Sequence, residues 1–77
     1  MELEIITPDK NLFNGKVKSI FLPGSDGSLG ILENHAPIIT TLKAGEIRID
    51  GESGKQSFSV NGGVVEVLKN KVIILAE

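Results

Sequence analysis

The sequence predicts an all-β protein, a β-sandwich of about ten short, mostly antiparallel strands with no long helix. Three observations support this prediction. Short runs alternate apolar and polar residues, turn signals rich in glycine, proline, asparagine and aspartate separate those runs, and no stretch shows a sustained apolar period of about 3.6 residues. We therefore expect a single β-sandwich domain over residues 1–77.

The first predicted strand covers residues 2–5, where leucine and isoleucine alternate with glutamate. The Thr-Pro-Asp-Lys segment at 7–10 ends this strand, because proline has no N–H for the ladder and aspartate favours a turn. Asn14-Gly15 then predicts a tight hairpin turn, since both residues tolerate positive φ angles. Residues 16–22 form the predicted returning strand.

A bulge is expected within this returning strand. Val17 is out of phase with Ile20, so an extra residue near positions 18–19 would bring Val17 back to the core. The same bulge leaves Phe21 facing outward.

The middle of the chain predicts two more strands around a loop. Gly24–Gly27 carries an Asp-Gly turn signature, and a short strand follows at 29–32. Glu33–Pro37 reads as a loop, since proline biases the residue before it toward an extended conformation. A strand is expected at 38–42, ended by a turn at Ala44-Gly45.

The last third predicts a series of hairpins. Residues 46–50 show the cleanest alternation, with isoleucines on one face and charges on the other. The final run, 72–76, is apolar on both faces, so we expect it to be central in a sheet or covered. Turns are expected at 51–54, 61–63 and 69–71.

The composition disfavours several classes of protein. The absence of cysteine excludes a disulfide framework, and a single histidine is too few for an ordinary zinc site, so we expect no metal and no cofactor. The net charge of −2, with scattered basic residues and neither tyrosine nor tryptophan, predicts no nucleic-acid partner. No apolar run reaches the roughly 18 residues that would span a bilayer.

The candidate chemical groups favour structural roles. The glycine-rich segment at 24–30 lacks the lysine and following helix of a phosphate-binding loop, and it reads as a hairpin. His35 has no cysteine or suitably spaced serine to activate, so it is interpreted as a structural or interface residue. The carboxylates fall at strand-outward or turn positions, so they predict no converging acid–base pair. We expect no catalytic residues.

An alternative from another class is a free-standing β interaction or carrier domain of the biotinyl or lipoyl kind. Such domains present a modified lysine at a hairpin tip, and Lys10, Lys55 and Lys71 are the candidates. None has the Met-Lys-Met or Asp-Lys-Ala flanks of those carriers.

Three segments carry a resemblance to a known family. Residues 7–15, 22–45 and 60–76 resemble, in order and spacing, the N-terminal β-sandwich of the epsilon subunit of the F-type ATP synthase. The match includes the Gly-Ser-Leu-Gly-Ile segment at 27–31 and His-Ala-Pro at 35–37. It implies a ten-stranded sandwich in a non-catalytic subunit of the central stalk. Such a subunit links the gamma subunit to the membrane c-ring and helps couple rotation to ATP synthesis.

The resemblance also implies a location and a set of contact residues. The location is the cytoplasmic face of the bacterial plasma membrane, where the chain is peripheral and held only through the complex. The gamma-side residues it implies are Phe21, Ile38 and Thr40. The loop that meets the c-ring and stalk comprises Ser28, Leu29, Gly30, Ile31, Leu32, Glu33, Asn34, His35, Ala36 and Pro37.

Apolar anchors are expected within this surface. The candidates are Phe21, Leu29, Ile31, Leu32 and Ile38, subject to which of them the core takes. On this basis, charged substitutions at Ile31 or Leu32 should weaken binding while the domain stays folded.

The sequence departs from the family in two places. Glu33-Asn34 stands where the family often has Pro-Gly before His-Ala-Pro, so the backbone of the loop is expected to differ. The two C-terminal helices that the family commonly carries are absent from residues 1–77. We therefore expect neither their inhibitory function nor ATP binding in this chain.

Overall fold

The computed structural model describes all 77 residues and contains six β-strands and no α-helix. The sheet order is β1-β6-β5-β4-β2-β3, and an additional β1–β2 pairing joins the first strand to the second. Every pairing is antiparallel except that of β1 with β6. No helix is long and apolar enough to cross a membrane. The strands are β1 (Glu2–Ile6), β2 (Asn11–Gly24), β3 (Gly27–Leu32), β4 (Ile38–Gly51), β5 (Gly54–Leu68) and β6 (Lys71–Ala76).

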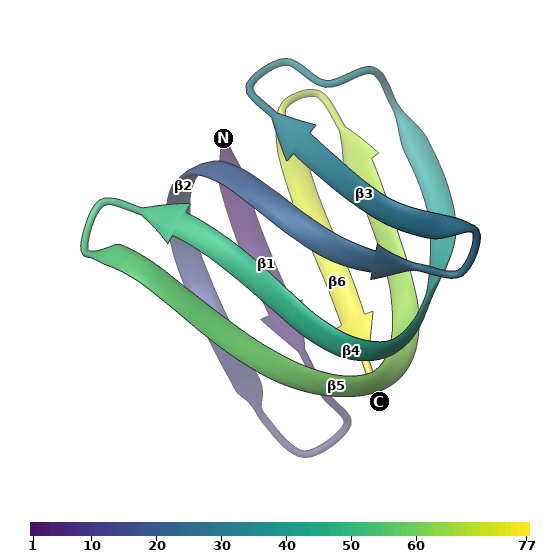
Figure 1. Ribbon diagram of the computed structural model, residues 1–77. Helices are drawn as coiled ribbons and strands as arrows, with labels where there is room; N and C mark the ends of the chain where they lie inside the picture. Colours follow the sequence, from purple (N-terminus) through teal and green to yellow (C-terminus); the bar gives the residue numbers. More distant parts are fainter.

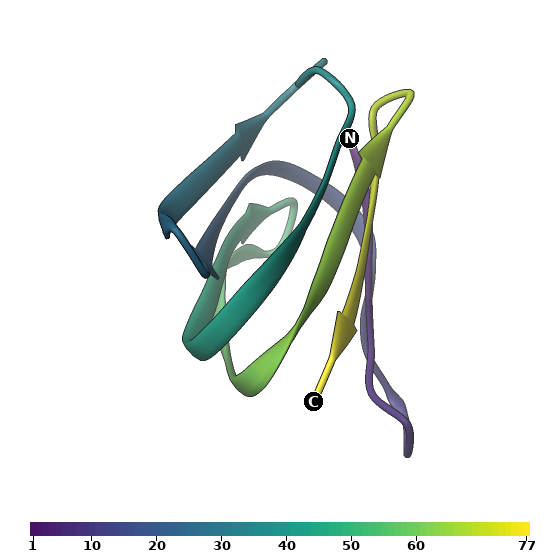
Figure 2. The same ribbon diagram turned by 90° about the vertical axis from the view of Figure 1, so that its right-hand side faces the viewer.

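The strands form two packed layers, which Figure 2 shows nearly edge-on. The long strands β2, β4 and β5 have 14, 14 and 15 residues and curve from one layer into the other (Figures 1 and 2). The first layer contains β1, β6 and the parts of the long strands that pair beside them. The second layer contains β3 and the remaining parts. The predicted β-sandwich with mostly antiparallel strands is confirmed.

Fewer and longer strands form than the sequence predicts, because some expected turns do not reverse the chain. The expected hairpin turn at Asn14-Gly15 is wrong: these residues lie within β2 and pair with Glu4 and Leu3 of β1. The reversal occurs earlier, in the 7–10 segment, where the Thr7 N–H donates to the Lys10 carbonyl at 2.9 Å. Once this turn has reversed the chain, residues 14 and 15 must be extended to pair with β1.

The expected turns at Ala44-Gly45 and 61–63 are also wrong. These segments lie inside β4 and β5. The two strands stay paired with each other through both segments, with Lys43 opposite Gly62 and Gly45 opposite Val60. At Gly62 and Gly63 the φ angles are 144° and 148°, which side-chain-bearing residues rarely adopt. Glycine therefore allows the strand to change direction here without ending it.

Other local predictions are confirmed. Turns connect β2 to β3, β4 to β5 and β5 to β6 at the expected positions. The β2–β4 register shifts between Val17 and Ser19, which is the predicted bulge. As expected, Val17 is buried and Phe21 is exposed. The strand β6 lies between β1 and β5, so it is central in the first layer.

The hydrophobic core fills the space between the layers. Both layers contribute fully buried side chains, including Ile5 and Ile74 from the first and Ile20 and Ile47 from the second. Sixteen residues form this core. The rings of Phe13 and Phe58 pack edge-to-face with their centroids 6.1 Å apart, which joins the two layers at its margin.

Candidate partner-binding surface

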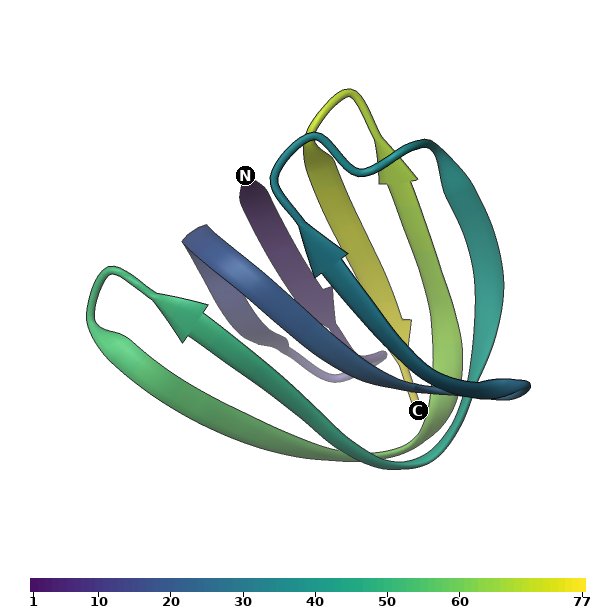
Figure 3. The ribbon, with the colours of Figure 1, turned by 45° about the horizontal axis from the view of Figure 1, so that its top comes forward.

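The loop that connects β3 to β4, Glu33–Pro37, forms the second half of the predicted contact segment 28–37, and we call it the docking loop. It lies beside the β5–β6 turn and the N-terminus of the structure (Figures 2 and 3). The loop backbone is fixed locally, because the His35 N–H donates to the Leu32 carbonyl at 3.2 Å. The Nδ1 atom of His35 lies 2.6 Å from the Ala36 carbonyl, so that ring nitrogen carries the donated hydrogen. These contacts fit a structural role for His35, and its role in partner binding stays a prediction.

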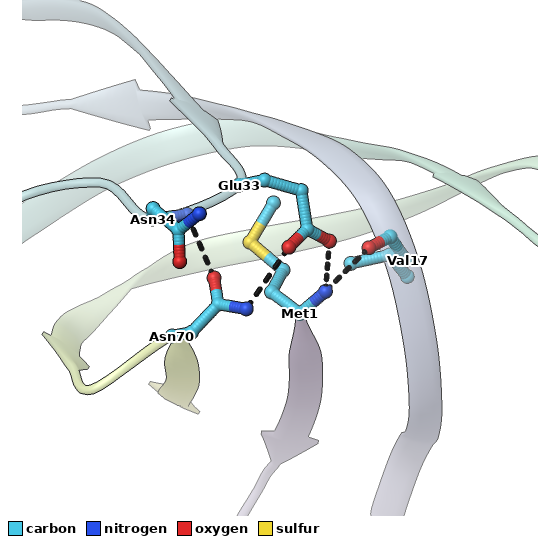
Figure 4. Close-up of polar contacts among 5 residues, drawn as sticks. All are labelled: Met1, Val17, Glu33, Asn34 and Asn70. Atoms are coloured by element: carbon cyan, nitrogen blue, oxygen red, sulfur yellow. Dashed lines mark hydrogen bonds and ion pairs between the residues drawn. The ribbon is translucent and has the colours of Figure 1, made fainter.

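The Asn70 side chain and the N-terminal ammonium group of Met1 also hold the docking loop (Figure 4). The Asn70 side chain accepts a hydrogen bond from the Asn34 N–H at 2.8 Å and donates one to Glu33 at 2.9 Å. The ammonium group of Met1 forms an ion pair with the other carboxylate oxygen of Glu33. It also donates to the Val17 carbonyl at 3.1 Å.

The charge of Glu33 is favoured by these neighbours. The hydrogen bond from the Met1 ammonium, and next the one from Asn70, lower the pKa of the Glu33 carboxyl group. Because the Glu33 side chain is 52% exposed, solvent screens this ion pair. The ion pair therefore contributes only modestly to the free energy of unfolding.

The outer side of the second layer carries two exposed apolar side chains and an arginine next to the docking loop. We define the Phe21 surface as Phe21, Leu32 and Arg48. Phe21 on β2 lies opposite Arg48 of the neighbouring strand β4 and diagonal to Leu32 of β3 on its other side. Phe21 is 57% exposed and Leu32 63%. Shallow depressions lie beside Phe21, and Arg48 lines two of them.

The predicted anchors divide between this surface and the core. Ile31 has no exposed area, because its side chain on β3 points between the layers. The expectation that a charged residue at Ile31 leaves the domain folded is therefore corrected. Leu29 and Ile38 are half-buried and pack against the core, so each presents only part of its side chain.

The remaining predicted contact residues follow the same two strands and the loop. Thr40 is half-buried on β4, whereas Ser28 and Gly30 are exposed on β3. A Cβ atom at Gly30 would lie 3.4 Å from the Phe21 ring, so glycine lets that ring lie close to the backbone of β3. Ala36 and Pro37 are exposed in the loop.

Sequence reasoning missed two groups of residues. The first is Met1 and Asn70, which hold the loop from positions far away in the sequence, and no local signal marks them. The second group lies on the outer face of the first layer. The apolar residues on both faces of the 72–76 segment are the one sequence pattern that points to this face. The exposed apolar side chains of that face are Ile39, Val64, Leu68 and Leu75.

The chemistry available at this surface is that of binding. No group of three or more histidine, cysteine or carboxylate side chains is placed to hold a metal ion. The surface offers exposed apolar side chains, an arginine, and a loop whose backbone is held by hydrogen bonds. Aromatic residues and arginine are enriched in the buried core of protein–protein interfaces.

Comparison with known proteins then places the chain in a family. The family model for the β-sandwich domain of the ATP synthase delta/epsilon chain matches residues 1–77. The chain belongs to this family. The epsilon chains of the family are accessory subunits of ATP synthase, a membrane-associated complex.

Curated relatives carry the same description. The ATP synthase epsilon chain of Chlorobium limicola is 42% identical over 77 residues, which cover 99% of this chain and 88% of that one. The epsilon chain of Pelotomaculum thermopropionicum is 46% identical over 74 residues, covering 96% of this chain and 55% of that one. For Helicobacter pylori (strain Shi470) the identity is 39%, over all of this chain and 63% of the relative. The chain thus spans little more than half of some relatives.

Solved structures confirm the fold. A chain in the mitochondrial ATP synthase of Euglena gracilis, described as OSCP/F1/c-ring, superposes with a TM-score of 0.88 and 23% identity, covering 96% of this chain and 48% of that one. A chain in the central stalk/c-ring structure of Tetrahymena thermophila mitochondrial ATP synthase gives a TM-score of 0.83 and 23% identity, covering 97% and 61%.

Proposed function

We propose that this chain is a non-catalytic central-stalk subunit of a proton-translocating ATP synthase. It links the gamma subunit to the c-ring and helps couple rotation to ATP synthesis. It lies at the cytoplasmic face of a bacterial plasma membrane and is held there only through the complex. The observation that carries this proposal is the match of all residues 1–77 to the β-sandwich domain of the ATP synthase delta/epsilon chain, together with the likeness to curated epsilon chains.

The structure supplies a surface that suits this function. The Phe21 surface gives apolar anchors, and the polar groups of the docking loop give a hydrogen-bonding rim. In this proposal Phe21, Ile38 and Thr40 face the gamma subunit, and the segment from Ser28 to Pro37 faces the ring and stalk. Ile31 contributes from the core by holding β3 in place.

The test is binding of the chain to a subassembly of the gamma subunit and the c-ring. We expect the wild-type chain to co-purify with this subassembly. Replacing Leu32 by aspartate should weaken binding by about tenfold or more, because it places a charge in the apolar centre of the interface. Leu75→Asp is the matched control, since Leu75 is 55% exposed but lies on the other layer.

The outcomes separate the assembly from the choice of surface. Failure of the wild-type chain to bind any ATP synthase subunit would contradict the proposed function. Binding that is lost in Leu75→Asp and retained in Leu32→Asp would contradict the assignment of the second layer. Melting temperatures of both variants equal to that of the wild type would show that neither result comes from unfolding.

A further inference from the structure

The side chain of Asn70 joins two segments that are far apart in the sequence. Its Oδ1 atom accepts a hydrogen bond from the Asn34 N–H, and its Nδ2 atom donates one to Oε2 of Glu33 (Figure 4). These contacts span 36 and 37 residues of sequence. We call Glu33, Asn34 and Asn70 the Asn70 clasp.

The backbone at both ends of the clasp has a defined shape. Asn34 has a φ angle of 60°, and Lys69 and Asn70 have φ angles of 51° and 60°. Asparagine adopts this left-handed conformation more readily than most residues. The β5–β6 turn therefore presents the Asn70 amide toward the docking loop, and the loop presents an N–H and a carboxylate in return.

The docking loop forms few hydrogen bonds within itself. His35 is half-buried, and the other loop residues are exposed. Apart from the local His35 contacts, the hydrogen bonds that reach Glu33–Pro37 come from Asn70 and from the Met1 ammonium. Asn70 supplies both a donor and an acceptor, and its side chain is the only one outside the loop that hydrogen-bonds the loop backbone.

We propose that Asn70 is a positioning residue for the docking loop, holding it in the shape that binds the stalk. This inference rests on the proposed function and assigns a new role to a residue outside the predicted surface. A loop that is already ordered loses less conformational entropy when a partner binds. The docking loop supplies the two groups that pair with the Asn70 amide, the backbone N–H of Asn34 and the carboxylate of Glu33.

The first experiment removes the clasp and keeps the turn. Glycine adopts positive φ angles freely, so Asn70→Gly keeps the β5–β6 turn and deletes only the side chain. Lys69→Gly is the matched control, because Lys69 shares the turn geometry and makes no side-chain hydrogen bond to the loop. We expect Asn70→Gly to lose hydrogen-exchange protection at the Asn34 amide and to bind the gamma–c-ring subassembly roughly three- to tenfold more weakly. Lys69→Gly should behave as the wild type in both measurements.

The second experiment reverses one hydrogen bond of the clasp. Asn70→Asp can still accept from the Asn34 N–H, but it loses its donor and places a second carboxylate against Glu33. In the double variant Glu33→Gln/Asn70→Asp, the new amide at position 33 donates to the new carboxylate at position 70. We expect the single variant Asn70→Asp to lose hydrogen-exchange protection in the docking loop and to lose affinity. The double variant should recover most of both and return close to the level of Glu33→Gln alone.

The outcomes distinguish this inference from the proposed function. If the wild-type chain does not bind the subassembly, the proposed function fails. If the wild-type chain binds and Asn70→Gly binds equally well, only the inference about Asn70 is overturned. Loss of affinity in Asn70→Gly and in the Lys69→Gly control alike would also overturn it, because the turn and not the side chain would then be responsible.

Discussion

At the scale of single residues, neighbouring positions on β3 have opposite roles. Ile31 is fully buried between the layers, whereas Leu32 is 63% exposed beside Phe21. The alternation of side chains along a strand explains the difference, because a step of one residue moves a side chain to the other face. Substitutions at these two positions therefore test the core and the surface separately.

Truncation of Ile31 should destabilise the protein. Ile31→Ala leaves a cavity among fully buried side chains, so we expect the free energy of unfolding to fall by about 2–5 kcal/mol. Leu32→Ala should change it by only about 0.5 kcal/mol or less. Urea denaturation of both variants measures this, and equal effects would contradict the assignment of Ile31 to the core.

The ion pair of Glu33 predicts a pH dependence. Contacts with Met1 and Asn70 lower the pKa of this carboxyl group from its ordinary value of 4.5, so its stabilising contribution is present above that value. It is lost as the pH falls through the lower pKa of the folded state. Glu33→Gln should therefore lower the melting temperature at neutral pH and have no effect in strong acid.

The control for this pH dependence is Glu52→Gln, since Glu52 is exposed in the β4–β5 turn and forms no ion pair. Melting curves recorded over a pH series would measure the difference between each variant and the wild type. A difference for Glu33→Gln that stays constant down to strong acid would show that its charge contributes nothing.

At the scale of the elements, glycines inside β5 allow the strand to bend. A Cβ atom at Gly63 would lie 2.3 Å from the Leu75 carbonyl oxygen, and the φ angle there is 148°. Gly27 also has a positive φ angle, 131°, but a Cβ atom there would meet nothing within 4 Å. The two positions separate the effect of close packing from that of backbone conformation.

Alanine at these glycines should have unequal effects. For Gly27→Ala we expect a loss of roughly 1–3 kcal/mol in the free energy of unfolding, the range for a strained backbone. For Gly63→Ala the loss should be larger, because β5 and β6 must also move apart. Chemical denaturation measures both, and an equal loss would show that the pairing of β5 with β6 adjusts without difficulty.

At the scale of the whole molecule, the two layers cannot separate without breaking long strands. Since β2, β4 and β5 each take part in both layers, we expect unfolding to be a single cooperative transition. Hydrogen exchange at buried amides of Ile47 and Val65, one from each layer, should report the same free energy. Exchange of one layer at a clearly lower free energy would contradict this prediction.

Much of the fold could be predicted from local sequence. The turns at Ser25-Asp26 and Lys69-Asn70 follow from residues that favour them, and the bulge in β2 follows from the phase of Val17. The predicted turn at Asn14-Gly15 is wrong because the same dipeptide also fits an extended strand when it pairs with β1. Glycine signals a change of direction, and only the pairing partners decide whether the strand ends.

Less of the candidate site than of the fold can be predicted from the sequence. Outward orientation of Phe21 follows from strand alternation, but the burial of Ile31 depends on how the second layer faces the first. The contacts of Asn70 with Glu33 and Asn34 depend on two turns meeting in space, which no local pattern encodes. The partner contacts assigned through the family resemblance remain predictions.

The passage of β2, β4 and β5 through both layers has a mechanical consequence. In a sandwich held only by side-chain contacts, a sideways force on one layer would be resisted by apolar packing, which has little directional preference. Here such a force is also carried by covalent backbone that runs from each layer into the other. The domain should therefore resist shear between its layers.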